Sequence, residues 1–181
     1  MTMQNVFLAR PSAEWKAAYL DFYREWKDSG EEMVPWVISR DPEADFEQMV
    51  QWLHERERGA AQLPGWVPDS TFWLVAEAGA IIGAVNIRHG LSEFLLYRGG
   101  HIGYGIRPSE RGKGYATRLL RLALPETRKL GIANALVVCD ETNLASARTI
   151  IRNGGVPDQD FVEENGNVIK RYWINLEPGQ P

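Results

Sequence analysis

A glycine-rich, basic stretch between two apolar segments has the composition of an anion-binding turn. Residues 101–106 read HIGYGI and resemble a strand, and residues 111–116 read RGKGYA and lead directly into an apolar helical pattern. The first N–H groups of a helix have no internal partner, and the helix dipole places partial positive charge there. Gly112 and Gly114 allow close approach of a ligand to the backbone, because neither carries a Cβ. The stretch therefore predicts a phosphate-binding site.

Two common phosphate-binding motifs are excluded by spacing. A P-loop has four residues between its first glycine and Gly-Lys-Ser/Thr, whereas a single residue separates Gly112 from Gly114. The dinucleotide-binding pattern GxGxxG fails because Thr117 occupies the third glycine position. A nucleotide-binding scaffold is therefore disfavoured.

The pattern that residues 111–116 do match is Arg/Gln-x-x-Gly-x-Gly/Ala. In this context, between a strand and a long amphipathic helix, it resembles the acetyl-CoA pyrophosphate loop of the GNAT superfamily of N-acetyltransferases. The resemblance extends over roughly residues 72–175. Its second marker is Asn143, followed by Leu-Ala-Ser, at the end of a buried strand. An amide offers both a donor and an acceptor, so the resemblance implies that Asn143 contacts the pantetheine arm, and the same residue can also cap a helix.

Composition and length indicate one globular domain. The chain has 181 residues, of which 44% are hydrophobic and 24% charged, and its net charge is −4. Nucleic acid is not an expected partner of such a chain. The single cysteine excludes an intrachain disulfide, and no Cys/His cluster has metal-ligand spacing, so no metal is expected. Without a signal-peptide pattern or a membrane-spanning stretch, the sequence predicts a cytoplasmic protein with no membrane contact.

Periodicity outlines the elements that must position the glycine-rich turn. Apolar spacing predicts helices from about Ala13, from Asp45, over 112–130 and over 144–152. The expected strands are 5–9, 71–77, 80–88, 101–106, 135–139, 161–164 and 167–175, with a type I′ hairpin at Asn165-Gly166. We expect an α/β fold of the GNAT type. It has a mixed, mostly antiparallel central sheet of six to seven strands, with helices on both faces. Residues 1–175 form a single acetyl-CoA-binding domain, and residues 176–181 form a flexible tail.

The resemblance also implies where the cofactor lies. In such folds the fourth and fifth strands separate, and pantetheine pairs with the open edge of the fourth strand. A backbone N–H there can stabilise the oxyanion that forms during acyl transfer. The residues expected to bind the cofactor are Tyr104, Gly105, Ile106, Arg111, Gly112, Lys113, Gly114, Tyr115, Ala116, Thr117, Asn143 and Ser146.

The sequence departs from the family pattern at both proton-transfer positions. Many members carry a tyrosine seven residues after the asparagine as the acid, and here that position is Ile150. A carboxylate that some members use as a base would fall near Gly100. His101 is the local substitute for the base, although a histidine in a strand is more often structural than catalytic. The candidate catalytic residues are therefore His101 and Asn143.

These patterns predict an N-acetyltransferase that moves an acetyl group from acetyl-CoA directly to a primary amine. The acceptor is a small-molecule amine or a protein or peptide amine, and a homodimer is left open. The rival interpretation is a CoA-binding sensor or regulatory domain without transferase activity, because the usual tyrosine is missing.

Overall fold

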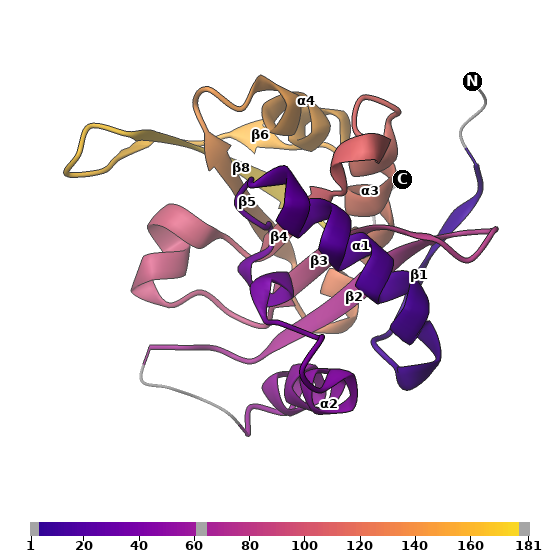
Figure 1. The fold of residues 1–181 in the computed structure, drawn as a ribbon. Helices are drawn as coiled ribbons and strands as arrows, with labels where there is room; N and C mark the ends of the chain where they lie inside the picture. The colour runs from indigo at the N-terminus through magenta and orange to yellow at the C-terminus, as the bar shows by residue number, and fades with distance from the viewer. Residues whose placement is uncertain (1–3, 61–64, 178–181) are drawn as a thin grey trace.

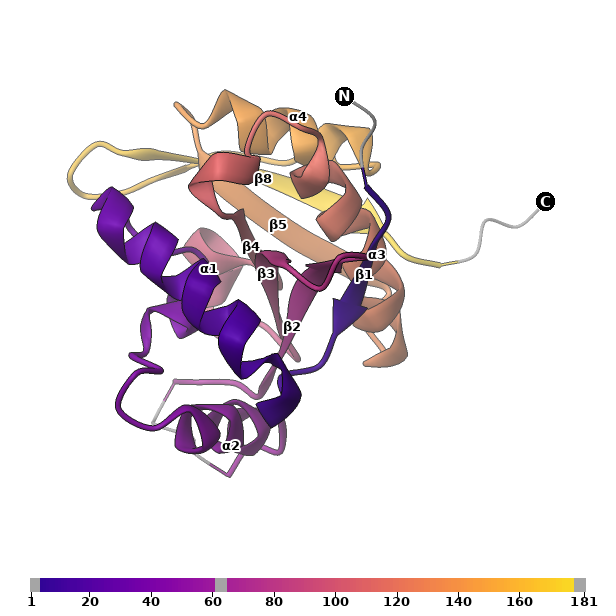
Figure 2. The same cartoon turned by 45° about the vertical axis from the view of Figure 1, so that its right-hand side comes forward.

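Two antiparallel sheets lie between helices that cover both of their faces (Figures 1 and 2). This arrangement comes from a computed structural model that describes residues 4–60 and 65–177. The first sheet has the order β1-β2-β3-β4, with strands at Val6–Ala9, Asp69–Ala76, Ile81–Arg88 and Ile102–Ile106. The second has the order β5-β8-β6, with β7 also paired to β8; its strands are Asn134–Asp140 (β5), Val156–Pro157 (β6), Phe161–Val162 (β7) and Val168–Asn175 (β8).

The division into two sheets corrects the expectation of one central sheet. β4 and β5 lie beside each other but share no ladder, so each sheet has four strands. The two strands meet at His101, whose N–H donates to the Leu136 carbonyl (2.7 Å) and whose Nδ1 accepts from the Leu136 N–H (2.9 Å). Because the imidazole accepts the Leu136 N–H, that group is not available for a backbone hydrogen bond between β4 and β5. The GNAT-like α/β arrangement, with helices on both faces, is confirmed.

One face of the first sheet is covered by α1 (Lys16–Ser29) and α2 (Phe46–Glu57). Four aromatic side chains of α1 are buried against β2 and β3, where they form a core rich in tilted and edge-to-face ring contacts: Tyr19, Phe22, Tyr23 and Trp26. Asp45 caps α2 by accepting the Gln48 N–H at 2.8 Å. The start of α2 therefore follows the local signal in the sequence, whereas α1 begins at Lys16 without a side-chain cap.

The opposite face of the first sheet is covered by α3 (Tyr115–Lys129), and α4 (Leu144–Arg152) packs beside α3 on β5 and β8 of the second sheet. Leu119, Leu120 and Ala123 of α3 are fully buried against strands of both sheets. α3 thus holds the two sheets together over the region where β4 and β5 separate (Figure 2). No helix in the described part of the chain is long and apolar enough to cross a membrane.

Short turns complete the chain around these elements. Helical turns at Trp36–Ser39, Leu95–Gly99 and Pro108–Glu110 connect the longer elements. At the C-terminal end, Leu176 is buried and its N–H donates to the Ala133 carbonyl at 2.8 Å. The other residues of the expected flexible tail lie outside the described ranges, apart from Glu177.

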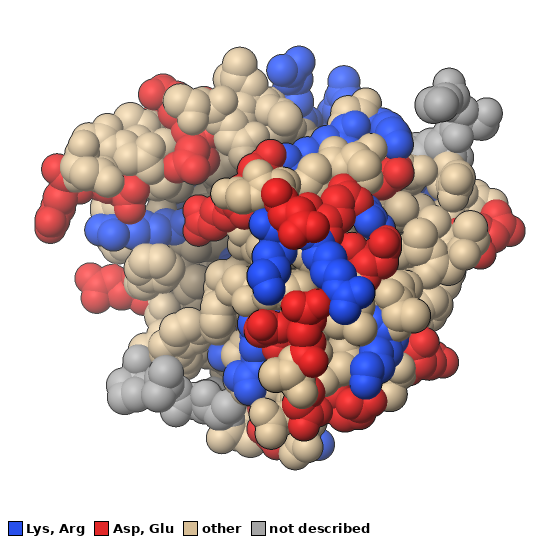
Figure 3. All heavy atoms as spheres, viewed as in Figure 1, with Lys and Arg blue, Asp and Glu red and all other residues tan. Residues whose placement is uncertain are grey.

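The face formed by α1 and α2 carries charges of both signs, closely interspersed (Figure 3). Several of them form ion pairs between the two helices and the segment that joins them, including Arg24 with Glu43 and Lys16 with Glu47. This face therefore lacks an extended patch of a single sign.

Close packing of β3 against β4 generates a prediction at Gly83. A Cβ there would lie 2.5 Å from the Gly105 carbonyl oxygen and 2.7 Å from Ile106 Cδ1. We expect Gly83→Ala to lower the free energy of unfolding by about 1–3 kcal/mol, because the β-ladder must shift to admit the methyl group. Urea unfolding followed by circular dichroism measures the change. Gly90→Ala is the matched control, since a Cβ at Gly90 meets nothing within 4 Å. Equal stability of the two variants would contradict the packing argument.

Candidate active site

A cleft opens where β4, the start of α3 and the first turns of α4 come together. Its volume is about 460 Å³. It is lined by Tyr104, Gly105, Ile106, Glu110, Arg111, Gly112, Gly114, Tyr115, Ala116, Thr117, Asn143, Ala145, Ser146, Arg148, Thr149 and Arg152. Every residue predicted to bind the cofactor lies in this lining except Lys113. His101 is also outside it.

The glycines of the turn are required by backbone conformation. Gly112 and Gly114 have φ values of 74° and 86°, in the left-handed region that other residues rarely adopt. A Cβ on Gly112 would meet no atom within 4 Å, so the protein itself does not crowd this position. The two left-handed residues turn the chain sharply from the end of β4 into the N-terminus of α3. The unpaired N–H groups of that terminus therefore face the cleft.

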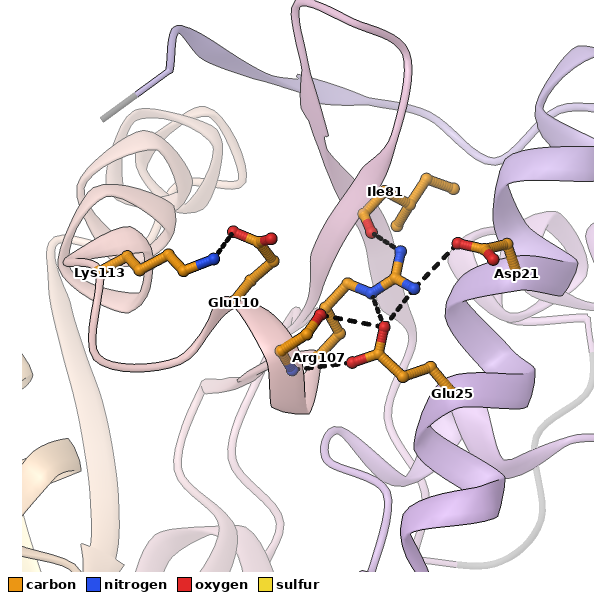
Figure 4. A network of polar contacts seen from close by, with 7 residues as sticks. Asp21, Glu25, Ile81, Arg107, Glu110 and Lys113 are labelled. Atoms are coloured by element: carbon orange, nitrogen blue, oxygen red, sulfur yellow. Dashed lines mark hydrogen bonds and ion pairs between the residues drawn. The ribbon is translucent and has the colours of Figure 1, made fainter. Parts of the chain in front are cut away.

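The base of the turn is anchored to α1 by a charged network (Figure 4). Glu25 accepts the Ser109 N–H at 2.8 Å and pairs with Arg107, which also contacts Asp21 and donates to the Ile81 carbonyl. Burial on its own would raise the pKa of Glu25, but the hydrogen bonds from Ser109 and Arg107 outweigh it and lower that pKa. The ionised carboxylate therefore fixes the chain at the end of β4.

The basic side chains of the turn are themselves engaged. Arg111 Nε donates to the Ile106 carbonyl at 3.0 Å, and its Nη1 lies 2.5 Å from Glu31. Lys113 pairs with Glu110 at 3.0 Å (Figure 4). Both side chains are thus drawn toward neighbouring carboxylates.

Two arginines of the cleft were missed by sequence reasoning. Arg148 and Arg152 lie on the cleft side of α4, with Ala145 and Thr149. Their spacing of three and four residues places all four on one helix face, and this periodicity was the available signal. They contribute positive charge on the side of the cleft opposite β4.

The free edge of β4 follows from its pairing with β3. The Arg88 N–H donates to His101 O, and the Arg107 N–H donates to Ile82 O, so the odd-numbered residues of β4 bond to β3. The backbone groups of the even-numbered residues consequently point away from β3. Tyr104 and Ile106 therefore offer N–H groups toward the cleft, whereas the Gly105 amide belongs to the ladder.

Asn143 serves as the N-cap of α4. Its Oδ1 accepts the Ser146 N–H at 3.0 Å. Among the described residues its Nδ2 has no hydrogen-bond partner, and the side chain lines the cleft. The amide oxygen of Asn143 is thus occupied by the helix, and its two N–H donors are available to a ligand in the cleft.

The hydroxyl of Tyr104 reaches across the cleft to α4. It lies 2.9 Å from Ser146 Oγ. Burial raises the pKa of Tyr104 to about 12, while the hydrogen bond from Ser146 acts in the opposite direction. The phenol is therefore protonated at neutral pH. Ile150, which stands where the family usually has tyrosine, is fully buried in the core.

The environment of His101 differs from that expected of a general base. The side chain is 6% exposed, and its Nδ1 is occupied by the Leu136 N–H. Burial, reinforced by the positive charge of Arg88, lowers the pKa of His101 to about 4. Nδ1 is therefore unavailable to a substrate, and the geometry favours a structural role at the junction of the two sheets.

A polar cluster on the α1/α2 face of the first sheet was also missed. Arg56 of α2 pairs with the buried carboxylate of Asp69, which accepts the Asn86 amide at 2.7 Å. Three tryptophan rings surround the Arg56 guanidinium at 4.9–5.1 Å: Trp36, Trp52 and Trp66. Polar residues at alternate positions of two otherwise apolar strands were the signal available in the sequence. Within the described residues, no group of three or more His, Cys, Asp or Glu side chains could hold a metal ion.

A comparison with protein families identifies the family of this chain. The model of the acetyltransferase (GNAT) domain matches residues 7–156. The chain belongs to the GNAT acetyltransferase family. The expected enzyme class, an acetyl-CoA-dependent N-acetyltransferase, is thereby confirmed. No curated protein matches the chain in sequence.

Solved structures share the same fold at low sequence identity. The ribosomal-protein-S5-alanine acetyltransferase from Vibrio fischeri has a TM-score of 0.71 and 15% identity, covering 100% of this chain and 98% of its own. The YncA protein from Salmonella typhimurium, with its cofactor acetyl-CoA, has a TM-score of 0.64 and 15% identity, covering 97% and 96%. Mutant forms of the spermidine/spermine N-acetyltransferase SpeG from Vibrio cholerae have a TM-score of 0.62 and 17% identity, covering 94% of this chain and 94% of their own.

The depressed pKa of His101 predicts a pH-dependent stability. Because the imidazole is neutral when folded and titrates near 6.5 when unfolded, the unfolded chain binds more protons between about pH 4 and 6.5. Its contribution to stability is therefore present above about pH 6.5 and is lost as the pH falls toward 4. His101→Asn keeps an acceptor for Leu136 without a titrating ring. We expect this variant to lose part of the slope of unfolding free energy against pH in urea titrations.

His54→Asn on α2 is the matched variant that also loses an imidazole, and its slope is compared with that of His101→Asn. With an acceptor amine, His101→Asn should retain kcat/KM to within about tenfold. A drop of 10²-fold or more at unchanged stability would instead make His101 the general base.

Proposed function

We propose that this cleft transfers an acetyl group from acetyl-CoA directly to the primary amine of an acceptor. The observation that carries the proposal is the convergence of three features on one cleft: the left-handed glycine turn before α3, the free edge of β4 and the unpaired N–H donors of the Asn143 amide. The turn suits a pyrophosphate, the β4 edge and the Asn143 amide suit a pantetheine chain, and an N–H of the β4 edge suits the thioester oxygen. The acetyltransferase family to which the chain belongs supports the same assignment.

The residues of the cleft fit the cofactor chemically. The N-terminus of α3 and the arginines of α4 supply positive potential for phosphates. The N–H groups of Tyr104 and Ile106 and the Asn143 amide match the alternating donors and acceptors of pantetheine. An N–H on β4 is also positioned to stabilise negative charge on the thioester oxygen during transfer.

The acid that protonates the departing thiolate must come from a residue other than Ile150. We assign it to the hydroxyl of Tyr104, which lines the cleft and is held by Ser146. As the amine nitrogen bonds to the carbonyl carbon and the C–S bond breaks, Tyr104 gives its proton to sulfur. The nitrogen releases a proton to solvent, from which Tyr104 is reprotonated.

The acceptor must present a neutral nitrogen. An alkyl amine with a pKa near 10.4 is neutral in only about one molecule in 2,500 at pH 7, so the site has to select or generate that form. Structural neighbours include proteins named as acetyltransferases of spermidine and of ribosomal proteins. Small-molecule and protein amines are therefore both candidate acceptors.

The glycine turn provides the first test of cofactor binding. Gly114→Ala forces a side chain into the left-handed region at the start of α3, and we expect CoA affinity measured by calorimetry to fall at least tenfold. Gly131→Ala is the matched control, because Gly131 has a φ of 81° just after the same helix and a Cβ there meets nothing within 4 Å. It should lose similar stability and keep its CoA affinity. Unchanged CoA binding by Gly114→Ala would contradict the site.

The role of Tyr104 is tested by Tyr104→Phe. Removing the hydroxyl should lower kcat by about 10²-fold or more while CoA affinity stays near that of the wild type. The defect should be smaller with an acetyl thioester whose thiolate is a better leaving group. A variant with wild-type kcat would show that the proton comes from elsewhere. Tyr97→Phe, a tyrosine outside the cleft lining, is the control.

A further inference from the structure

Arg88, at the end of β3, has a guanidinium that this chain leaves without a counter-ion. The side chain is partly exposed, and its Nη1 donates to the carbonyl of Gly99 at 2.9 Å. Asp69 lies directly across the ladder from Arg88, but its carboxylate is taken by Arg56 and Asn86. Among residues 4–60 and 65–177, no carboxylate lies within ion-pair distance of Arg88, and its Nε and Nη2 make no hydrogen bond.

The guanidinium lies next to the strand that forms one edge of the cleft. A Cβ on Gly103 would be 3.1 Å from Arg88 Nη2 and 3.2 Å from its Nη1, so the group packs on the backbone of Gly103. Gly103 directly precedes Tyr104, the first cleft residue of β4. Gly103 is one residue from Tyr104 and three residues from Ile106, whose N–H groups face the cleft, and a strand rises about 3.3 Å per residue. Arg88 occupies the α1/α2 face of β4, away from α3.

Asn86 gives a second, independent sign of a missing ligand. It is fully buried, and its Nδ2 donates to Asp69 and Thr71 on β2. Its Oδ1 is therefore turned away from those residues, and it has no partner in the described structure. Asn86 is two residues before Arg88 on the same strand face and pairs in register with Gly103. A buried amide oxygen without a hydrogen-bond partner lowers the free energy of unfolding, and a donor from a bound molecule would remove this cost.

The charge of this cluster is positive. Arg56 and Arg88 contribute two positive charges and Asp69 one negative charge, which leaves one positive charge uncompensated. Burial lowers the pKa of Arg88 to about 10, with Asp69 acting to raise it and Arg56 to lower it, so the guanidinium is still cationic at neutral pH. Such a site repels a polyamine and attracts an anionic group.

We propose that the acceptor is an amine that also carries a carboxylate, and that Arg88 binds this carboxylate through its Nε and Nη2. The inference rests on the proposed acetyl transfer and names its substrate class. A planar carboxylate matches the two parallel donors of a guanidinium edge. Asn86 Oδ1 accepts a hydrogen bond from the acceptor, and the amine is held over Gly103 toward β4. Arg88 is thus a specificity-determining residue.

Matched pairs of amines that differ only in the carboxylate test this proposal. Phenylalanine is compared with phenethylamine, leucine with isoamylamine, and lysine with cadaverine, and CoA release gives kcat/KM. We expect the wild type to favour the amino acid of at least one pair by about 10–100-fold, the range of a hydrogen bond to a charged group. Equal rates within every pair, or a preference for the amines without the carboxylate, would overturn the proposal.

Two variants test whether the preference for the amino acid depends on Arg88. Arg88→Gln should reduce the preference for the amino acid over the carboxylate-free amine to near unity. Gly103→Ala keeps the charge but displaces the guanidinium by its methyl group, so it should weaken the preference and provides the test if Arg88→Gln fails to fold. Arg24→Gln, an exposed position on α1, is the control for a lost positive charge. A preference that survives in both Arg88→Gln and Gly103→Ala would overturn the role of Arg88.

A binding measurement separates this inference from the proposed function. N-acetylphenylalanine and N-acetylphenethylamine are titrated by calorimetry into wild type and Arg88→Gln in the presence of CoA. If no amine releases CoA, the proposed function fails, yet tighter binding of the acetylated amino acid by the wild type alone still supports the carboxylate site. Equal binding of both compounds by both proteins would reject that site, whatever the activity.

Discussion

The separation of β4 from β5 is the constraint on which the rest of the structure depends. A continued ladder would have satisfied every backbone group of β4 internally and left no edge for a ligand. The histidine at the junction prevents this, because its Nδ1 takes the Leu136 N–H that would otherwise continue the pairing. Gly100 permits the approach, since a Cβ there would lie 2.6 Å from the Leu136 carbonyl. α3 then packs across both sheets and stabilises the divergence.

The two ends of β4 are held by different kinds of interaction. At its start, two hydrogen bonds to a neighbouring strand define the point of divergence. At its end, Glu25 of α1 binds the backbone of Ser109 and the side chain of Arg107, which fixes the direction in which the chain enters the glycine turn. The cleft is thus shaped by contacts distant in sequence, and α1, which does not line it, contributes to its geometry.

The first sheet carries unlike chemistry on its two faces. One face packs apolar residues against α3 and belongs to the large core around the cleft. The other has aromatic packing at its centre and a buried ionic cluster toward one end, where Arg56 is enclosed by tryptophans. Burying charges is costly unless each is paired, and the cluster pairs Arg56 with Asp69 but not Arg88.

Local signals in the sequence determined the elements and the phosphate turn, because caps, glycines and apolar periodicity act over a few residues. Asp45 starts α2 as predicted, and the glycine pair initiates α3. The resemblance implied that the fourth and fifth strands separate, but only the tertiary structure placed the last contact between them at His101, whose Nδ1 accepts the Leu136 N–H. It also decided which polar residues lie together. Asp69 and Arg88 are opposite in register, yet their partners, Arg56 of α2 and the backbone of Gly99, come from elements that no local pattern relates.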